Sequence, residues 1–582
     1  MPSLHAVTKR LAIVLLPLSI ALTAYLYLYP FVHRCAFPAP PAGVQTWLDD
    51  CAFDDETLRE HYSRREAAPF RLLALGDPQL EGDTSLPAEV VKKFLGFQRL
   101  RRDILDNNWE QSLQSLRYLA EDICARSLRI VRSARKHLDL LGNDFYLAHI
   151  YRTLHWATQP THVTVLGDLL GSQWIDDGEF ERRAGRFWHR VFRGAEKVPR
   201  QTWQDYSKGK EDRAAIQVLG SDVRWRSRII NVAGNHDIGY AGDIGRERIE
   251  RFERQFGRVN GDIRLKLPAH NCTLDLQHEN TPNLRLVVLN SMNLDGPAYD
   301  GTLQQETYKF INSVIDHSDP VGTHYTSTIL LTHIPLHKES GVCVDEPFFS
   351  YFPQEQGGGV QEQNMLSKDS SLGASLQGIF GKHPDVNAPA AGLGRDGIIL
   401  TGHDHEGCDV YHYVDREQGS WTASRYESEQ AVKARSNSSV PGLREVTVRS
   451  MMGEFGGNAA LVSAWWDQQQ GKWQIEVQMC SLGVQHIWWA IHVIDVVSVL
   501  VCLLAVVTRA SEPAVTSVAP VARTRNVKSA IGVETKKTPL PMKKKSSAFS
   551  RRLRQSLEED GLHGGNLKSK KSPGSKTNKK KP

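Results

Sequence analysis

Short runs of apolar residues recur along the chain, and most of them end in a polar cluster. Five runs of four or five residues, rich in aliphatic and β-branched side chains, cover 71–75, 162–166, 229–232, 328–331 and 397–400. This length and composition predict buried strands. Helical stretches lie between them, for example at 106–134 and 144–157, which predicts the strand–helix alternation of an α/β domain. In such domains functional side chains gather at the carboxyl ends of the strands.

The later part of the chain adds three strands and two exposed segments to this prediction. The runs at 443–448, 460–465 and 474–478 indicate a meander that follows the last polar cluster. The segment 351–381 is rich in Gln, Gly and Ser, which predicts a surface loop over the site. The segment 416–440 is polar, so we expect it to be exposed.

Two longer apolar runs, at 11–32 and 484–507, are long enough to cross a bilayer as helices. The first could instead be a cleaved signal peptide. However, it exceeds the usual apolar core of about 7–15 residues, and no clear small-x-small cleavage site follows it. The second contains His486, His492 and Asp495, so a buried core helix is the alternative there. We interpret both as membrane spans, and we expect Asp495 to snorkel or to pair locally.

Basic residues flank the outer ends of both runs. Lys9 and Arg10 precede the first run and Arg509 follows the second, so the positive-inside rule predicts that both chain ends are cytosolic. The residues between the runs then face the lumen or the cell exterior. The predicted organisation is a cytosolic N-terminus (1–10), a span (11–32), a lumenal linker (33–69), a lumenal domain (70–483), a second span (484–507) and a disordered basic cytosolic tail (508–582).

Two further observations agree with a lumenal domain. Asn271 and Asn437 each begin an Asn-x-Ser/Thr sequon, which is a glycosylation acceptor in secretory compartments. Seven of the eight cysteines also lie between the two apolar runs, where disulfides are permitted. The spacing of these cysteines does not determine how they pair.

The composition of the 582 residues is that of a globular protein with an unusual tail. Hydrophobic residues at 40% and charged residues at 24% argue against collagen, wholesale disorder and a polytopic transporter. Residues 508–582 hold 19 Lys and Arg against 5 Asp and Glu, whereas the remainder holds 52 against 61. A basic tail behind an acidic body argues against a nucleic-acid enzyme. Near the C-terminus, Lys579 and Lys580 resemble the dilysine retrieval signal of endoplasmic reticulum membrane proteins.

The polar clusters at the strand ends contain side chains that bind cations. They are Asp77, Gln79, Asp168, Asn235, His236, Asp237, His333, His403 and His405. A single Gly-Asp pair after a strand is usually a turn, but five such clusters in this order are hard to obtain by chance. Carboxylate, amide and imidazole ligands suit divalent ions such as Mn, Fe or Zn. The set is too poor in thiolate for a structural zinc site.

The chain resembles the calcineurin-like metallophosphoesterases over about residues 70–480. The resemblance rests on five blocks in order: Asp77-Pro-Gln79, Gly167-Asp168, Gly234-Asn235-His236-Asp237, His333 and Gly402-His403-Asp404-His405. It implies a four-layer α/β/β/α sandwich with two mixed sheets and a dinuclear metal site. The Gly-Asp-Pro-Gln opening, the block at 167–192 and the two anchors are similar to one branch of that superfamily. This branch removes ethanolamine-phosphate from glycosylphosphatidylinositol (GPI) anchors in the endoplasmic reticulum.

The resemblance also implies a ligand set for two divalent ions, with Mn expected and Zn or Fe as alternatives. Asp77 and His405 would bind the first ion, and Asp168 would bridge both. The second ion would be held by Asn235, His333 and His403. Most members have His where this chain has Gln79, whose carbonyl is a weaker and harder ligand. This departure favours Mn over Zn, and Gln79 could bind the first ion directly, bind it through water or not bind it.

The two residues after Asn235 would carry the catalytic roles. His236 resembles the catalytic histidine of the family, which would stabilise the developing charge or protonate the leaving alkoxide. Asp237 would orient that imidazole. The alternative for His236, a capping or core histidine, is at odds with its position among ligand residues.

The function implied by the resemblance is release of ethanolamine-phosphate from a mannose of GPI anchors, which would aid export of GPI-anchored proteins. The partners would be GPI-anchored glycoproteins, the membrane, and cargo receptors and coat proteins at the dilysine tail, with no nucleic acid. The protein would reside in the endoplasmic reticulum membrane and could cycle to the early Golgi. The alternatives are a lumenal phosphatase for another phosphoester and a catalytically weak cargo or assembly factor. Gln79 favours the last of these, and the intact His236 argues against it.

Overall fold

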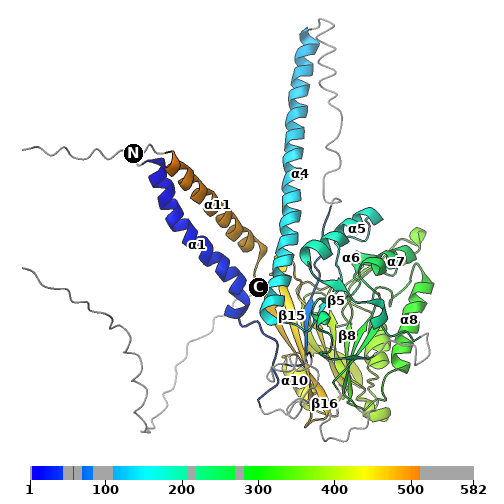
Figure 1. The fold of residues 1–582 in the computed structure, drawn as a ribbon. Coiled ribbons are helices and arrows are strands. Elements are labelled where there is room, and N and C mark those ends of the chain that lie inside the picture. The colour runs from blue at the N-terminus through cyan, green and yellow to red at the C-terminus, as the bar shows by residue number, and fades with distance from the viewer. Residues whose placement is uncertain are drawn as a thin grey trace, which may run out of the picture. The chain divides into compact units, whose positions relative to one another are not determined.

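The computed structural model describes residues 3–42, 57, 68–82, 109–206, 216–268 and 281–511. Two β-sheets packed face to face, with helices on their outer sides, confirm the predicted mixed α/β sandwich (Figure 1). The main helices are α1 (Leu4–Val32), α4 (Trp109–Thr158), α5 (Asp177–Arg186), α6 (Asn235–Ile238), α7 (Arg246–Gln255), α8 (Gly301–Asp316), α9 (Lys368–Ser370), α10 (Glu429–Ser436) and α11 (Gln485–Ala510). The predictions on Asn271, on Lys579 and Lys580, and on the basic tail beyond residue 511 lie outside the described residues.

The first sheet has six strands. Their order is β16 (Lys472–Ser481), β15 (Asn458–Asp467), β1 (Phe70–Leu75), β2 (His162–Val165), β5 (Arg228–Asn231) and β3 (Glu196–Lys197). The last four of these strands are parallel, and β15 is antiparallel to both β1 and β16. The carboxyl ends of β1, β2 and β5 therefore lie at one edge of the sheet.

The second sheet has eight strands. Their order is β13 (Ser420–Arg425), β12 (Cys408–Asp415), β14 (Gly442–Thr447), β11 (Asp396–Thr401), β8 (Thr326–Leu331), β7 (Asn283–Val288), β6 (Gly261–Lys266) and β4 (Gln217–Val218). The four central strands β14, β11, β8 and β7 are parallel. A separate hairpin pairs β9 (Phe349–Tyr351) with β10 (Val360–Gln363).

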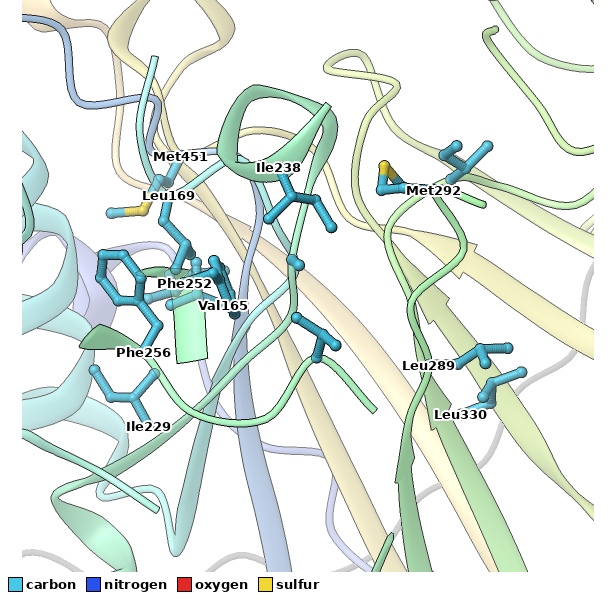
Figure 2. Close-up of a cluster of buried hydrophobic side chains, with 14 of the residues drawn as sticks. Val165, Leu169, Ile229, Ile238, Phe252, Phe256, Leu289, Met292, Leu330 and Met451 are labelled. Atoms are coloured by element: carbon cyan, nitrogen blue, oxygen red, sulfur yellow. The ribbon is translucent and has the colours of Figure 1, made fainter. Parts of the chain in front are cut away.

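Alternate residues of the central strands face different parts of the core. In β1, Phe70, Leu72 and Ala74 belong to a buried cluster that also contains residues of the second sheet, so they lie between the sheets. Leu73 and Leu75 point the other way and pack with the helices. This two-residue period is the one expected of a strand buried on both faces. Figure 2 shows part of the helix-facing core, in which Phe252 and Phe256 lie near Val165 and Ile229.

Several local predictions need correction. The five short strands occur where the apolar runs predicted them, but β14 joins the second sheet whereas β15 and β16 join the first, so the three do not form one meander. The segment 351–381 is not a loop, because it contains β10 and a buried π-helical turn (Ser371–Ile379). The segment 416–440 forms β13 and α10, with Trp421 and Ala431 buried. The two predicted helices after residue 106 are one continuous helix, α4.

The two longer apolar runs form α1 and α11, whose side chains are mostly exposed. Ser3 caps α1 by accepting a hydrogen bond from the N–H of Ala6 at 3.3 Å, so the helix begins earlier than the predicted span. Both helices are long and apolar enough to cross a bilayer, which suggests a membrane protein. They lie side by side in Figure 1.

A polar cluster joins the two apolar helices. Asp495 of α11 accepts hydrogen bonds from Ser19 Oγ at 2.6 Å and from Thr23 Oγ1 at 2.9 Å, both on α1. Ser498 Oγ donates to the carbonyl of Leu15 at 3.3 Å. The acidic side chain inside the apolar run is therefore paired locally, as expected for a polar group in a helix–helix interface.

Two disulfides connect distant parts of the chain. Cys35, just after α1, pairs with Cys480 near the end of β16, and Cys343 pairs with Cys408 at the start of β12. The first disulfide joins the end of one apolar helix to the strand that leads into the other. Cys502 within α11 is a free thiol.

A buried ion pair fixes the loop that follows β8. Glu445 of β14 accepts hydrogen bonds from the N–H of Leu336 at 2.8 Å and from His412 Nε2 at 2.6 Å. Its carboxylate also lies 2.9 Å from Lys338 Nζ, and both charged side chains are almost completely buried. Burial alone would raise the pKa of Glu445, but Lys338 and His412 outweigh it and lower the pKa to about 2. The carboxylate is therefore charged across the neutral and mildly acidic range.

We expect Glu445→Ala to lower the free energy of unfolding by about 3–5 kcal/mol, because it leaves the Lys338 ammonium buried without its partner. The matched control is Glu476→Ala, since Glu476 is half-exposed and lies 3.7 Å from Arg444, a contact worth about 0–1 kcal/mol. Denaturant titration of the detergent-solubilised protein measures both. The pKa of Glu445 is lower in the folded state, so its carboxylate stabilises that state until the pH falls toward the folded-state pKa. The difference in unfolding free energy between the two variants should therefore persist at pH 5. Equal effects of the two substitutions would contradict this assignment.

Candidate metal centre

The strand ends of both sheets meet at one edge, and the predicted ligands lie there. They are Asp77 after β1, Asp168 after β2, Asn235 after β5, His333 after β8, and His403 and His405 after β11. Hydrogen bonds between the sheets hold the edges together. The N–H of His403 donates to Asp77 Oδ1 at 3.1 Å, and His333 Nδ1 lies 2.7 Å from the carbonyl of Leu166.

Three hydrogen-bond acceptors converge around His333. Because a carbonyl can only accept, His333 must donate its Nδ1–H to Leu166, which leaves a lone pair on Nε2 in the neutral ring. That Nε2 lies 3.0 Å from Asn235 Oδ1 and 3.3 Å from Asp168 Oδ1. With the Asn235 amide oriented in this way, all three atoms are acceptors, and a cation between them would satisfy this arrangement.

His403 completes this group. Its Nε2 lies 2.8 Å from the carbonyl of Gln363, so Nε2 carries the proton and Nδ1 keeps its lone pair. Ligand atoms of His403, His333 and Asp168 all lie within 4.8 Å of one another. Both imidazoles thus have one nitrogen fixed by a backbone carbonyl, which is how proteins orient histidine ligands.

A second group of ligand atoms shares Asp168. Atoms of Asp77, Asp168 and His405 lie within 4.8 Å of one another. Oδ2 of Asp77 is completely buried and accepts no hydrogen bond from any described residue. A buried carboxylate oxygen without a donor is costly unless a cation or proton meets it. The two groups therefore form two adjacent candidate cation sites, with Asp168 common to both.

Gln79 lies at the second of these groups. Its amide nitrogen donates to Asp168 Oδ2 at 3.0 Å and lies 3.1 Å from His405 Nε2. A rotation of the amide by half a turn would direct the carbonyl oxygen to the same place. The structure thus brings Gln79 together with the predicted ligands, in contact with two of them.

The electrostatics of the cluster also favour bound cations. Burial and the neighbouring Asp168 raise the pKa of Asp77 well above its usual range. Burial lowers the pKa of the His333 imidazole and lowers the pKa of His403 to about 3, so both rings are neutral and can act as ligands. Two buried carboxylates this close repel each other, and divalent cations relieve that repulsion. The donor set of Asp, Asn, Gln and His fits two divalent metal ions.

The backbone at the cluster adopts conformations that are uncommon outside glycine. Asp77, Gln79, Asp168 and His403 have φ values of 47°, 40°, 49° and 74°. Such left-handed conformations cost free energy in non-glycine residues and concentrate at functional sites. Four neighbouring predicted ligands with this feature indicate that the fold directs these side chains at the expense of local stability.

Close packing of the loops at the strand ends requires glycine beside the ligands. A Cβ on Gly234 would lie 2.2 Å from Asp168 Oδ1, and a Cβ on Gly167 would lie 2.2 Å from His333 Nδ1. Gly167 also has a φ of 98°. Any larger residue at these positions would displace a ligand. This steric limit explains why glycine precedes Asp168 and Asn235 in the sequence.

The predicted catalytic histidine lies at the rim of the cluster. The side chain of His236 is 36% exposed, and its Nε2 is 3.8 Å from Asp168 Oδ2. The backbone N–H of His236 donates to Asp168 Oδ1 at 2.9 Å, so the residue is anchored to the shared carboxylate. Its imidazole is therefore accessible to a substrate from solvent.

Asp237 has a different environment from the one predicted. Its carboxylate accepts hydrogen bonds from the N–H groups of Gly234, Leu169 and Leu170 at 2.9, 3.2 and 3.0 Å. It therefore joins the loop after β2 to the loop before α6 and does not contact the imidazole of His236. Burial and Asp168 raise the pKa of Asp237 to about 8. Its observed contacts are those of a residue that positions two ligand-bearing loops.

Two residues outside the polar clusters also support the site. Gln363, at the end of β10, provides the carbonyl that orients His403, and its own side chain is buried and donates to Asp295 Oδ2 at 3.0 Å. Ser450 Oγ donates to the carbonyl of Asp77 at 3.1 Å. Neither residue belongs to a recognisable motif, because a backbone carbonyl or a single hydroxyl leaves no pattern in the sequence. The exposed Asn437 has no part in the cluster and lies at the end of α10.

Comparison with known proteins supports the same chemistry. No protein-family model matches the chain. The chain is 29% identical over 532 residues to Protein TED1 of Saccharomyces cerevisiae, which covers 84% of this chain and 96% of that protein. It is 26% identical over 291 residues to Metallophosphoesterase 1 of Xenopus laevis, covering 47% and 58% of the two chains. Metallophosphoesterase 1 of Mus musculus is 23% identical over 294 residues, covering 47% and 57%.

An Asp and His cluster that could hold two divalent ions at the junction of two mixed sheets fits the chemistry of a metal-dependent phosphoesterase. Together with these relatives, it identifies the chain as a metallophosphoesterase. The predicted enzyme class is confirmed.

Replacing Gln79 by histidine tests whether this residue contributes to metal binding. Because imidazole is the better ligand for zinc, Gln79→His should raise the Zn²⁺ affinity by about tenfold or more, which corresponds to about 1.4 kcal/mol. Chelator competition on the metal-free full-length protein measures the affinity. The matched control is Gln469→His on the exposed turn after β15, which should change nothing. An unchanged affinity in Gln79→His would mean that residue 79 does not reach the metal.

Proposed function

We propose that the protein is a metal-dependent phosphodiesterase that removes ethanolamine-phosphate from a mannose of GPI-anchor glycans in the endoplasmic reticulum. The observation that carries the chemistry is the pair of ligand groups that share the buried Asp168. The choice of substrate rests on the resemblance of the Gly76-Asp77-Pro78-Gln79 opening and the flanking apolar helices to the GPI-processing branch. The similarity to TED1 over most of both chains is compatible with it.

The residues of the cluster suit hydrolysis of a phosphodiester. When bound, two divalent ions in such sites activate a water molecule and offset the charge of the phosphate oxygens. Asp77, Gln79, Asp168 and His405 would hold one ion, and Asn235, His333 and His403 the other with Asp168. We propose Mn²⁺ as the metal, because the amide oxygens of Gln79 and Asn235 are hard ligands.

His236 is the side chain that we expect to act on the leaving group. Its half-exposed imidazole lies beside the shared carboxylate, and its backbone hydrogen bond to Asp168 fixes its position. From there it can stabilise charge on the phosphate or donate a proton to the sugar alkoxide as it departs. Asp237 would serve this role only indirectly, through the loops that it joins.

Three observations support a lumenal orientation of the sandwich. Both disulfides lie between α1 and α11, and such bonds persist in oxidising compartments. The sequon at Asn437 is exposed, so an oligosaccharide could be attached there. The basic residues that follow α11 and those near the N-terminus of α1 obey the positive-inside rule for cytosolic ends.

One specific feature favours a second candidate, a cargo or assembly factor of low activity. The amide nitrogen of Gln79 bonds to Asp168 and contacts His405, so it occupies space between two ligands of one ion. A site with weak affinity for that ion would hydrolyse slowly. A phosphatase acting on another lumenal phosphoester would use the same cluster and differs only in its substrate.

The decisive assay uses the purified full-length protein, chelated and then supplied with Mn²⁺ or Zn²⁺, acting on a GPI glycan that carries ethanolamine-phosphate. We expect metal-dependent release of ethanolamine-phosphate. His236→Ala should lower kcat by roughly 10²–10⁴-fold with metal content unchanged, because it removes a proton donor and no ligand. Asn235→Ala should lower both activity and metal content. The control is His189→Ala, an exposed histidine outside the cluster.

The other outcomes of this assay separate the candidates. Turnover of a generic phosphodiester without turnover of the glycan would retain the chemistry and overturn the GPI assignment. Metal binding without turnover of any phosphoester would favour the cargo or assembly factor, and Gln79→His would then be the variant to test for recovered activity.

Glycosylation mapping tests the orientation. Expression of the full-length chain in eukaryotic cells should give an endoglycosidase-sensitive band, and Asn437→Gln should remove one step of that gel shift, because a sequon is modified only on the lumenal side. Asn387→Gln, an exposed asparagine outside any sequon, should leave the band unchanged. If Asn271→Gln combined with Asn437→Gln did not alter the mobility, the lumenal orientation would be contradicted.

A further inference from the structure

The outer edge of β10 contacts the metal centre. One edge of this strand pairs with β9, and the other faces the candidate ion sites. On that outer edge the carbonyl of Gln363 lies 2.8 Å from His403 Nε2, and the carbonyl of Val360 accepts a hydrogen bond from the N–H of Gly242 at 2.9 Å. Gly242 belongs to the loop that follows α6, the helix that carries His236. The part of β10 between these two contacts therefore borders the ligands of the second ion.

Glu362 lies in this part of β10 and points to solvent. Adjacent residues of a strand face opposite ways. The side chain of Gln363 is buried and donates to Asp295, and its cross-strand partner Phe349 packs against the core. Glu362 and its own cross-strand partner Ser350 therefore occupy the outer face of the hairpin. The Glu362 side chain is accordingly exposed.

The carboxylate of Glu362 lies in the surroundings of the metal centre. Because the carbonyl of the next residue, Gln363, contacts His403, the Cα of Glu362 is at most about 9 Å from His403 Nε2. Burial raises the pKa of the Tyr240 hydroxyl, and the negative charges of Asp168 and Glu362 raise it further. The ring of Tyr240 in turn packs edge-on against the His403 imidazole, with 6.3 Å between the ring centroids. One hydroxyl thus lies within the field of both the shared metal ligand and Glu362.

The negative charge of Glu362 has no partner within the described part of the chain, where no Lys, Arg or His side chain forms an ion pair with it. Two other carboxylates of this region are paired. Asp243, which accepts a hydrogen bond from the N–H of Tyr240, lies 2.7 Å from Arg248, and Asp295 is buried and accepts hydrogen bonds from three groups. An unpaired carboxylate beside a phosphate-binding site repels the phosphate, so it disfavours binding unless the substrate brings a positive charge to it.

We propose that Glu362 binds an ammonium group that the substrate carries a few bonds from its phosphorus atom, so that the metal centre selects aminoalkyl phosphoesters over neutral ones. This inference rests on the proposed function and assigns a specificity-determining residue to that same site. An ammonium group has three donors and a carboxylate accepts them strongly, because both groups are charged. The two-carbon arm of ethanolamine-phosphate is short, which suits a carboxylate this close to the ligands of the second ion.

The first test compares two soluble aryl phosphodiesters, one with a 2-aminoethyl group and one with a 2-hydroxyethyl group. In both, a hydroxide derived from water bonds to phosphorus and the aryloxide leaves, so the two reactions differ only in the retained group. The full-length protein supplied with Mn²⁺ should show the higher kcat/KM for the aminoethyl ester. Glu362→Gln removes the charge and keeps the size of the side chain, so the ratio of the two kcat/KM values should fall about fivefold.

A matched control and a charge reversal accompany this variant. Glu355→Gln makes the same chemical change at an exposed glutamate in the turn of the same hairpin, and it should keep the original ratio. Glu362→Lys should instead favour an aryl ester with a 2-carboxyethyl group, because the new side chain attracts a carboxylate. A purely structural role of Glu362 would not produce this reversal. The same ratio in Glu362→Gln and in the original protein would overturn the inference.

Binding measurements test the same contact without any turnover. Calorimetric titration of the full-length protein in the presence of Mn²⁺ compares free ethanolamine-phosphate with 2-hydroxyethyl phosphate. Ethanolamine-phosphate should bind about fivefold more tightly, and Glu362→Gln should make the two affinities equal. Equal affinities in the original protein would overturn the inference, and so would failure to bind either ester.

These outcomes are distinguishable from those of the glycan assay. A preference for the aminoethyl ester that depends on Glu362, without release of ethanolamine-phosphate from a GPI glycan, would support the inference and contradict the proposed substrate. Vesicles of phosphatidylethanolamine, assayed in parallel, would then show whether another carrier of the same group is hydrolysed. Release from the glycan at the same rate in Glu362→Gln would retain the proposed function and overturn the inference.

Discussion

The buried negative charge of Asp77 and Asp168 is the constraint on which the rest of the structure depends. The two carboxylates lie within 4.8 Å of a common histidine ligand at the junction of the two sheets, and neither has access to bulk water. In this position they repel each other, and one oxygen of Asp77 meets no donor among the described residues. Divalent cations would remove this repulsion and saturate the acceptors.

Much of the surrounding structure serves to bring these acceptors together. Glycine at 167 and 234 lets the backbone of one loop approach the ligand of another, and positive φ at Asp77, Asp168 and His403 directs side chains inward. Backbone carbonyls accept hydrogen bonds from the protonated ring nitrogens of His333 and His403 and so fix both imidazoles. These features destabilise the apo chain locally, and the hydrophobic core between the sheets supplies the free energy that maintains them.

The connection between the sandwich and the two apolar helices is also rigid. A disulfide, a set of backbone hydrogen bonds and the packing of Tyr146 on Trp488 leave little freedom at the junction.

Most of the predicted strands and ligands could be found in the sequence because their signals are local. A short β-rich run followed by Gly-Asp or Gly-Asn-His-Asp describes both a strand and the residues at its carboxyl end. Each ligand therefore lies next to its own strand signal. Gln79, which departs from the family pattern, could be located in this way, although its contacts with Asp168 and His405 could not.

Features that depend on distant segments were decided by tertiary structure alone. The separation of β14 from β15, the pairing of Cys35 with Cys480 and the carbonyl of Gln363 behind His403 each join residues far apart in the chain. Asp237 was expected to orient its neighbour His236, but its carboxylate accepts hydrogen bonds from three backbone N–H groups in two loops. The sequence by itself thus determined which side chains reach the edge of each sheet, because side-chain chemistry and strand propensity are local properties. Only the packing of one sheet on the other decided which atoms face each other, because a hydrogen bond between distant segments leaves no pattern in either one.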